Sequence, residues 1–261
     1  MQNLKDSAIK GTLTGVISVA RSGAQAALKA IYPAQCVCCN ALVEEHGTIC
    51  PSCWPKVPFI FGLCCDSCGL PLPGHDDGTP VQCDDCLTLA RPWAQGRAVM
   101  LYGDKARQML LGLKYYDRLD LAAPAGKWLA RHAQPMLQPD MLVAPIPLHW
   151  LRFVKRRCNQ AALLSTALAR ELALDYCPDL LIRTRNTGTQ DGRGRMGRFA
   201  NVADAFAAHP RQGARIKGRH ILLVDDVMTA GATFAAATEV CLAHGAASVR
   251  VIALARVARM E

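Results

Sequence analysis

Two adjacent carboxylates near the C-terminal end of the chain have the types and spacing of ligand-binding residues. Ile221 to Val224 is a short apolar run rich in β-branched residues, and Asp225 and Asp226 follow it directly. Such a run is typical of a parallel strand that is buried on both faces. Because ligands of open parallel sheets bind beyond the carboxyl ends of the strands, the two acids are predicted at a ligand-binding edge.

The loop after the acids has the composition of a phosphate site. It consists of Thr229, Ala230, Gly231, Ala232 and Thr233. A helix is expected from Thr233, a possible N-cap, to a stop at Gly245, and a strand over 247–254. Free backbone N–H groups and the positive end of the helix dipole favour a phosphate there.

Two carboxylates would repel that phosphate unless they bind hydroxyls or a metal ion carried by the ligand. A ribose 5-phosphate satisfies both requirements, with vicinal hydroxyls for the acids and a phosphate for the loop. The alternative is a helix-capping turn beside two incidental acids, which leaves the paired carboxylates without a ligand to explain them.

Cysteines form a second group of candidate ligands, because ten of the thirteen lie between Cys36 and Cys86. Four CxxC pairs account for eight of them: Cys36/Cys39, Cys50/Cys53, Cys65/Cys68 and Cys83/Cys86. Two thiolates at this spacing can reach one zinc ion at about 2.3 Å, and two pairs complete a tetrahedron. Asn40 and Gly69, each just after a pair, suit the left-handed conformation that such turns need.

Sequential pairing is the simplest assignment, with the first two CxxC pairs on one zinc and the last two on a second. A cross-braced arrangement stays open, and either Cys38 or Cys64 could replace its neighbour as a ligand. A disulfide framework would need an oxidising compartment, and no convincing secretion signal supports export to one. We therefore expect two structural zinc ions, and no membrane span, since no run of eighteen apolar residues occurs.

Charge divides the chain. The net charge is +9 overall, but residues 32–90 carry −6, residues 1–31 carry +3 and residues 91–261 carry +12. This asymmetry marks a boundary near residue 90 and assigns an anion-seeking surface to the second part. Together with the short apolar run near the N-terminus and the CxxC pairs, it gives an expected organisation of an N-terminal helix (1–31), a double zinc ribbon (32–90) and an α/β domain (91–261).

Strands and helices alternate in the last part, as in a parallel sheet flanked by helices. Strands are expected within 93–103 and 141–144. Helices are expected from 105 to about Tyr115, over 119–133 with Pro124 kinking it or marking its first turn, and over 159–172.

Two basic loops complete the candidate site. Loop 145–157 follows a predicted strand and contains Pro147, His149, Arg152 and Arg156, which are candidates for binding pyrophosphate. Loop 186–198 is Gly-rich and contains Arg193, Arg195 and Arg198, which suits a lid that excludes water or a contact to a nucleic-acid backbone. No catalytic residue is assigned.

The stretch LLVDDVMTAGAT (222–233) resembles the phosphoribosyl-diphosphate (PRPP) motif of type I phosphoribosyltransferases. With LKYYDR (113–118), PIPLHWLRFVKRRCNQA (145–161), TGTQDGRGRMGRFANVADAF (187–206) and the four CxxC pairs, the chain resembles the ComF family of competence and GntX-type proteins. The family often has Thr where this chain has Ala230, and a glycine and an aromatic residue where it has Arg157 and Cys158.

The resemblance implies a cytoplasmic protein with a double zinc ribbon fused to a type I phosphoribosyltransferase-like domain that binds PRPP with Mg²⁺. Asp225 and Asp226 would hold the ribose hydroxyls, and the loop 229–233 the 5′-phosphate. The implied role is in DNA uptake (natural competence) and single-stranded DNA handling, with DNA-uptake or recombination proteins as partners. The alternative is an active phosphoribosyltransferase that transfers ribose 5-phosphate from PRPP to an unidentified base or amine.

Overall fold

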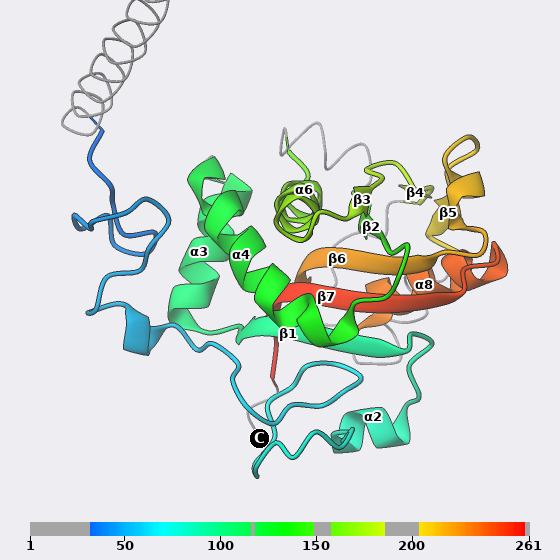
Figure 1. Ribbon diagram of the computed structural model, residues 1–261, viewed down its shortest axis with the longest axis horizontal. Helices are drawn as coiled ribbons and strands as arrows, with labels where there is room; N and C mark the ends of the chain where they lie inside the picture. The colour runs from blue at the N-terminus through cyan, green and yellow to red at the C-terminus, as the bar shows by residue number, and fades with distance from the viewer. Residues whose placement is uncertain (1–31, 116–117, 149–157, 186–203, 259–261) are drawn as a thin grey trace, which may run out of the picture. The chain divides into compact units, whose positions relative to one another are not determined.

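The computed structural model describes residues 32–115, 118–148, 158–185 and 204–258, which are drawn in colour in Figure 1. The chain divides into two units, Met1–Cys53 and Trp54–Glu261. The predicted N-terminal helix, the predicted lid and residues 149–157 of the first basic loop lie outside the described residues. Among the described residues, no helix is long and apolar enough to cross a membrane.

The described part of the first unit is organised around cysteines. Cys36, Cys50 and Cys53 form a small buried core, against which Val43 and Ile49 pack. Asn40 has a φ of 62°, so the residue after the first CxxC pair is left-handed, as predicted. A segment this short buries little apolar surface, so its fold depends on what the cysteines bind.

A five-stranded parallel sheet is the centre of the second unit, with the strand order β1-β7-β6-β2-β3. Its strands are β1 (Gln95–Leu101), β2 (Leu142–Pro145), β3 (Asp175–Tyr176), β6 (His220–Met228) and β7 (Ser248–Arg256). A separate antiparallel pair joins β4 (Leu181–Arg183) to β5 (Phe206–Ala208). The predicted parallel α/β fold is therefore confirmed.

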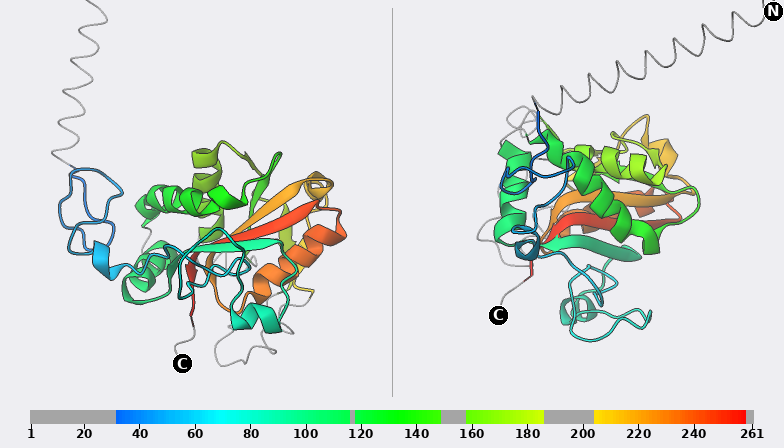
Figure 2. Two further views of the ribbon diagram at one scale, coloured as in Figure 1. Left: turned by 60° about the horizontal axis from the view of Figure 1, so that its bottom comes forward. Right: turned by 60° about the vertical axis from the view of Figure 1, so that its left-hand side comes forward.

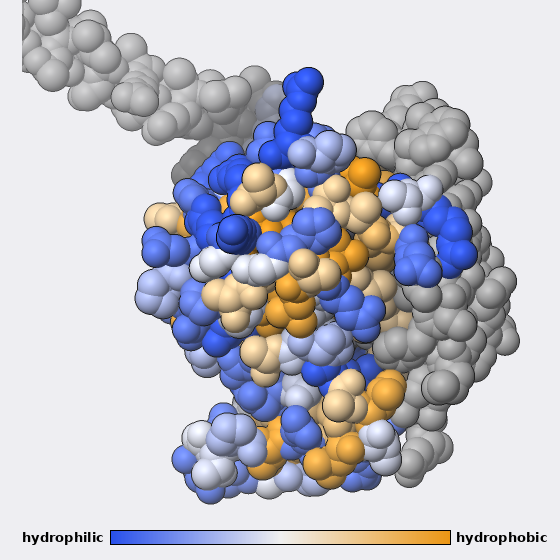
Figure 3. Space-filling view, turned by 90° about the vertical axis from the view of Figure 1, so that its right-hand side faces the viewer, coloured by the Kyte–Doolittle hydropathy of each residue, from blue (hydrophilic) through white to orange (hydrophobic). Residues whose placement is uncertain are grey.

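Helices cover both faces of the sheet, as Figures 1 and 2 show. The longer helices are α3 (Asp104–Tyr115), α4 (Ala122–Ala133), α6 (Gln160–Leu172) and α8 (Ala232–Ala243), and α2 (Asp84–Thr88) is a short helix before β1. α4 and α6 pack on each other and on one face, whereas α8 lies on the other. Apolar side chains show between hydrophilic ones on the side that faces right in Figure 1 (Figure 3).

The predicted helices and strands lie close to the observed ones. Asn159 caps α6 by accepting a hydrogen bond from the Ala161 N–H at 3.1 Å, and Pro124 lies in the first turn of α4. Gly245 has a φ of 81° just after α8, as expected of a helix stop. The prediction of Thr233 as N-cap is wrong, because α8 begins at Ala232 and Gly231 is its N-cap.

Close packing of α4 on α6 depends on Gly126. A Cβ atom at this position would lie 2.5 Å from the Ala167 Cβ and 2.9 Å from its carbonyl carbon. We expect Gly126→Ala to lower the free energy of unfolding by about 1–3 kcal/mol, because the helices would have to move apart. Gly112→Ala in α3 is the control. The added Cβ would be 3.4 Å from the nearest atom, so Gly112→Ala should be neutral or stabilising. Urea titration measures the free energy of unfolding of both variants.

Candidate functional site

The two acids lie on β6 at the point where its two neighbours differ in length. β2 ends at Pro145, opposite Val224, whereas β7 continues to pair with β6 through Asp225 and on to Met228. The predicted end of the strand at Val224 is therefore too early, because pairing with β7 carries the strand past the acids. β2 leads through α6 to β3, and β6 leads through α8 to β7, so the connections diverge here. A point where connections diverge is the expected ligand position in a parallel sheet.

Lys114, in the last turn of α3, neutralises one of the acids. Its Nζ lies 2.6 Å from Oδ2 of Asp226, and both side chains are largely buried. Lys114 was not among the residues predicted for the site. The available signal was its place in the LKYYDR stretch, at the C-terminal end of a predicted helix.

Asp225 is in a different electrostatic state from its neighbour. Burial and the adjacent Asp226 carboxylate raise the pKa of Asp225 to about 8. The Asp226 backbone N–H, which donates to Asp225 Oδ1 at 2.8 Å, and the charges of Lys114 and Arg183 act in the opposite direction. At neutral pH Asp225 is therefore mainly protonated, and the ion pair of Asp226 leaves the two acids with little net negative charge.

The loop after β6 ends at the N-terminus of α8. Gly231 has a φ of 81°, a left-handed conformation that favours glycine, and Ala232 is the first helical residue. Among the described residues, no side chain caps this helix. Backbone N–H groups of the first turn therefore remain available to an anion, and the helix dipole favours one.

Few of the residues predicted to bind pyrophosphate are described. Pro147 is half-buried and follows the end of β2. The Ile146 N–H before it donates at 2.9 Å to the carbonyl of Val224, the residue that precedes the two acids on β6. The other candidates in the two basic loops lie outside the described residues: His149, Arg152, Arg156, Arg193, Arg195 and Arg198. Their roles remain predictions.

The eight CxxC cysteines gather into two clusters in chain order. The first cluster is Cys36, Cys39, Cys50 and Cys53, and the second cluster is Cys65, Cys68, Cys83 and Cys86. Within each cluster the sulfur atoms all lie within 4.8 Å of one another. Neither Cys38 nor Cys64 belongs to a cluster.

Sulfur geometry in both clusters fits zinc. A tetrahedral zinc with sulfurs at about 2.3 Å holds them about 3.8 Å apart. The Cys39–Cys50 and Cys68–Cys83 sulfur pairs are both separated by 3.7 Å. The Cys36 sulfur also accepts a hydrogen bond from the Cys50 N–H at 3.2 Å, which stabilises a thiolate. Both clusters are thus suited to a structural zinc ion, which would supply cross-links that a small module lacks.

Cys68 in the second cluster has thiolate character. Hydrogen bonds from the Cys65 and Cys86 thiols lower the pKa of Cys68 and outweigh burial, which acts in the opposite direction. The nearby charge of Arg256 lowers it further. A deprotonated sulfur is the form that binds a metal ion.

The parallel sheet, the paired acids at its carboxyl edge and the cysteine clusters define a phosphoribosyltransferase-type domain that carries zinc ribbons. Residues 27–87 match the family model for a double zinc ribbon domain, and residues 159–261 match that for a phosphoribosyl transferase domain. The chain belongs to the ComF family. It is 31% identical over 231 residues to the DNA utilization protein YhgH of Escherichia coli, covering 86% of this chain and 97% of that protein.

Other relatives have names that refer to competence. Competence protein F of Haemophilus influenzae is 25% identical over 231 residues, covering 85% of this chain and 96% of that protein. Competence protein ComFC of Bacillus subtilis is 29% identical over 223 residues, covering 82% of this chain and 87% of that protein. Among solved structures, the glutamine PRPP amidotransferase of B. subtilis aligns with a TM-score of 0.36 at 19% identity, covering 55% of this chain and 30% of that one.

Proposed function

We propose that this chain binds PRPP, or a related ribose 5-phosphate ligand, as a component of DNA uptake or utilization. The observation that carries this proposal is the pairing of Asp225 and Asp226 with the uncapped N-terminus of α8 at one edge of the sheet. The acids suit the ribose hydroxyls, and the loop 229–233 suits the 5′-phosphate.

Charge at the acids makes a phosphate ligand feasible. Two ionised carboxylates beside the loop would repel an anion. Here Lys114 neutralises Asp226, and the raised pKa of Asp225 keeps its carboxyl group mainly neutral. A protonated Asp225 can both donate to and accept from a ribose hydroxyl. Mg²⁺ would enter with the pyrophosphate group of PRPP rather than occupy a site made by protein alone.

The link to DNA rests on the names of the relatives and on charge. The matching proteins are named for DNA utilization and competence. Residues 91–261 carry a net charge of +12, which suits a polyanionic partner such as single-stranded DNA. The basic loops 145–157 and 186–198 remain the proposed pyrophosphate and lid segments. Residues 32–90 remain the proposed ribbon module, and a reducing cytoplasm suits its thiolates.

A titration of PRPP with Mg²⁺ tests the proposal directly. We expect wild type to bind, and Asp225→Asn/Asp226→Asn to bind at least tenfold more weakly, because both ribose contacts are altered. Asp140→Asn is the matched control. Asp140 is exposed and has a φ of 53°, which asparagine also adopts, so its affinity should equal that of wild type.

The outcomes separate a binding protein from an active transferase. Unchanged affinity in the double variant would remove the acids from the site, and a wild type that does not bind would overturn the proposal. Pyrophosphate release with any tested base or amine would favour an active phosphoribosyltransferase. Binding without release, together with salt-dependent binding of a single-stranded oligonucleotide, would favour a ligand-responsive DNA-handling protein.

A further inference from the structure

Arg91 joins the second cysteine cluster to the candidate phosphate loop. Its Nε donates to the Cys86 sulfur at 3.5 Å, and its Nη1 donates to the Ala230 carbonyl at 2.8 Å. One guanidinium group thus has one edge on a cluster sulfur and another on the backbone of the loop. The two contact points are far apart in the chain, so folding alone brings them together.

Arg256, the last residue of β7, makes a second connection of the same kind. Its Nη2 lies 3.8 Å from the Cys68 sulfur, and its Nη1 donates to the Thr229 carbonyl at 2.5 Å. This side chain is only 4% exposed. Thr229 and Ala230 are consecutive, so the two arginines bind neighbouring carbonyls of the loop and two different sulfurs of the cluster.

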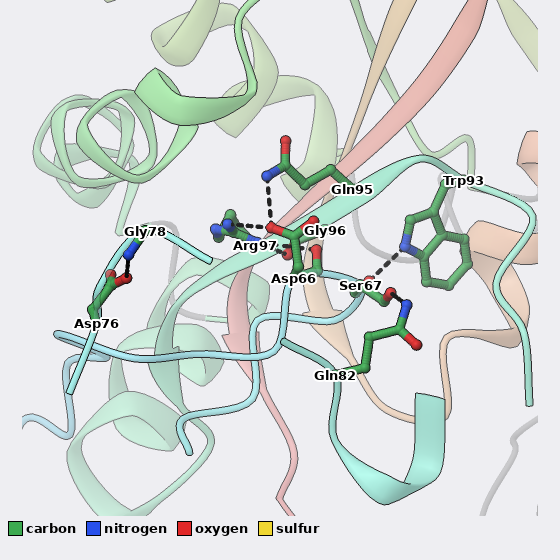
Figure 4. Close-up of polar contacts among 9 residues, drawn as sticks. All are labelled: Asp66, Ser67, Asp76, Gly78, Gln82, Trp93, Gln95, Gly96 and Arg97. Atoms are coloured by element: carbon green, nitrogen blue, oxygen red, sulfur yellow. Dashed lines mark hydrogen bonds and ion pairs between the residues drawn. The ribbon is translucent and has the colours of Figure 1, made fainter. Parts of the chain in front are cut away.

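Trp93 supports the same loop through packing. Its Nε1 donates to the Ser67 carbonyl at 2.6 Å (Figure 4), and Ser67 lies between Cys65 and Cys68 in the sequence. Its ring contacts the loop so closely that a Cβ on Gly231 would lie 2.9 Å from Trp93 Cη2. Arg91 lies over this ring, 5.7 Å from its centroid. Trp93 therefore packs between the second cluster and the loop and contacts both.

Electrostatics explains why arginines are used. A buried cation is costly unless an anion compensates it. Within the described part of the chain, neither Arg91 nor Arg256 has a carboxylate within ion-pair distance. Four thiolates around a divalent zinc carry two net negative charges, which two guanidinium groups balance. With zinc bound, the arginines and the cluster would therefore stabilise each other.

We propose that the second cysteine cluster positions the phosphate loop through Arg91 and Arg256. Both arginines are positioning residues, because they bind the carbonyl groups of the loop. The N–H groups of the first turn of α8 are left available to the ligand. The inference rests on the proposed function only in naming the 5′-phosphate as that ligand. It predicts that affinity for phosphate depends on the state of the second cluster.

The test compares two arginines that contact the same ribbon. Arg97 donates to Asp66 Oδ1 at 2.6 Å and to the Asp66 carbonyl at 3.0 Å (Figure 4). It pairs with Ile252 of β7, four residues before Arg256, so it contacts the ribbon away from the loop. Arg97→Gln therefore serves as the matched control for Arg91→Gln. Zinc content and the melting curve are recorded for each variant, so that loss of metal or of folding is recognised.

Hydrogen–deuterium exchange of the backbone amides in 229–234 is the first measurement, because it requires no ligand. We expect Arg91→Gln to speed this exchange at least fivefold with zinc retained, Arg91→Lys to speed it less, and Arg97→Gln to change it less than twofold. Wild type and variants are then titrated with PRPP and Mg²⁺, where Arg91→Gln should bind at least fivefold more weakly.

Unchanged exchange in Arg91→Gln, or equal acceleration in Arg91→Gln and Arg97→Gln, would overturn the inference. Equal acceleration would mean that the ribbon stabilises the domain in general rather than through this contact. If Arg91→Gln loses zinc or unfolds, the Arg91→Lys variant replaces it in the test. An Arg91→Lys variant with the same amide exchange and the same PRPP affinity as wild type would then overturn the inference. A wild type that fails to bind PRPP would refute the proposed function alone, since the exchange comparison does not involve PRPP.

Discussion

Cys65→Ser in the second cluster is expected to destabilise the whole second unit, whereas Cys36→Ser in the first cluster should leave the stability of that unit unchanged. The two cysteines are matched, because each is 0% exposed and each opens a CxxC pair. Serine removes one metal ligand in either case. The difference lies in what surrounds each cluster.

The second cluster belongs to the main hydrophobic core. Its four cysteines pack in one cluster of buried residues with Trp93, Phe234 and Val251. The first cluster has a small core of its own within residues 32–53. Losing zinc from the second cluster should therefore lower the free energy of unfolding of the sheet domain by roughly 3 kcal/mol or more, since metal binding and the contacts of the two arginines with the cluster are lost together.

Urea titration followed by tryptophan fluorescence measures this difference, because Trp93 is 4% exposed beside the second cluster and should report its loss. Zinc content of each variant is measured in parallel. Equal urea midpoints of unfolding for Cys65→Ser and wild type would contradict the prediction. A larger decrease in this midpoint for Cys36→Ser than for Cys65→Ser would contradict it as well.

Local patterns in the sequence were sufficient for much of the fold. Apolar runs located β2 and the buried part of β6, the helix expected over 159–172 corresponds to α6, and Gly245 marked the end of α8. CxxC spacing favoured grouping of the cysteines in chain order as the simplest assignment, and the two clusters confirm it. These features depend on neighbours within a few residues, which is why they can be recognised in one sequence.

Features that depend on distant partners could not be predicted. β6 continues past Val224 because β7 pairs with it, and β3, β4 and β5 are too short to give a periodic signal. Contacts of Arg91 with Ala230 and of Arg256 with Cys68 join residues 139 and 188 positions apart. No spacing rule connects residues so far apart in the chain, although they hold the loop that local patterns had located.

The local pattern also left open how two acids could border a phosphate site. Ionisation of Asp225 is disfavoured, since burial and Asp226 raise its pKa to about 8. In the unfolded chain the same carboxyl group titrates near its ordinary value, about 3.9. Between about pH 4 and pH 8 the folded state therefore binds more protons than the unfolded state, and the stability of wild type falls as the pH rises through this window.

Asp225→Asn should remove that loss, because asparagine keeps the shape of a protonated aspartate and does not ionise. We expect the variant to exceed wild type in free energy of unfolding by roughly 2–4 kcal/mol at pH 8, and by much less at pH 5. Urea titrations at the two pH values measure both differences. Asp140→Asn is the control. Its carboxyl group is exposed and its φ of 53° suits asparagine, so its difference in stability from wild type should not grow between pH 5 and pH 8.

An Asp225→Asn variant whose advantage does not grow between pH 5 and pH 8 would show that the carboxyl group ionises normally in the folded state. A stability advantage of Asp225→Asn that grows between pH 5 and pH 8, together with weakened PRPP binding in Asp225→Asn/Asp226→Asn, would indicate that Asp225 serves ligand binding. A residue whose loss stabilises the fold is retained for its ligand, since packing alone would favour asparagine. The free energy that Asp225 costs the ligand-free fold would then be offset when a ribose hydroxyl or the Mg²⁺ of the ligand binds the carboxylate.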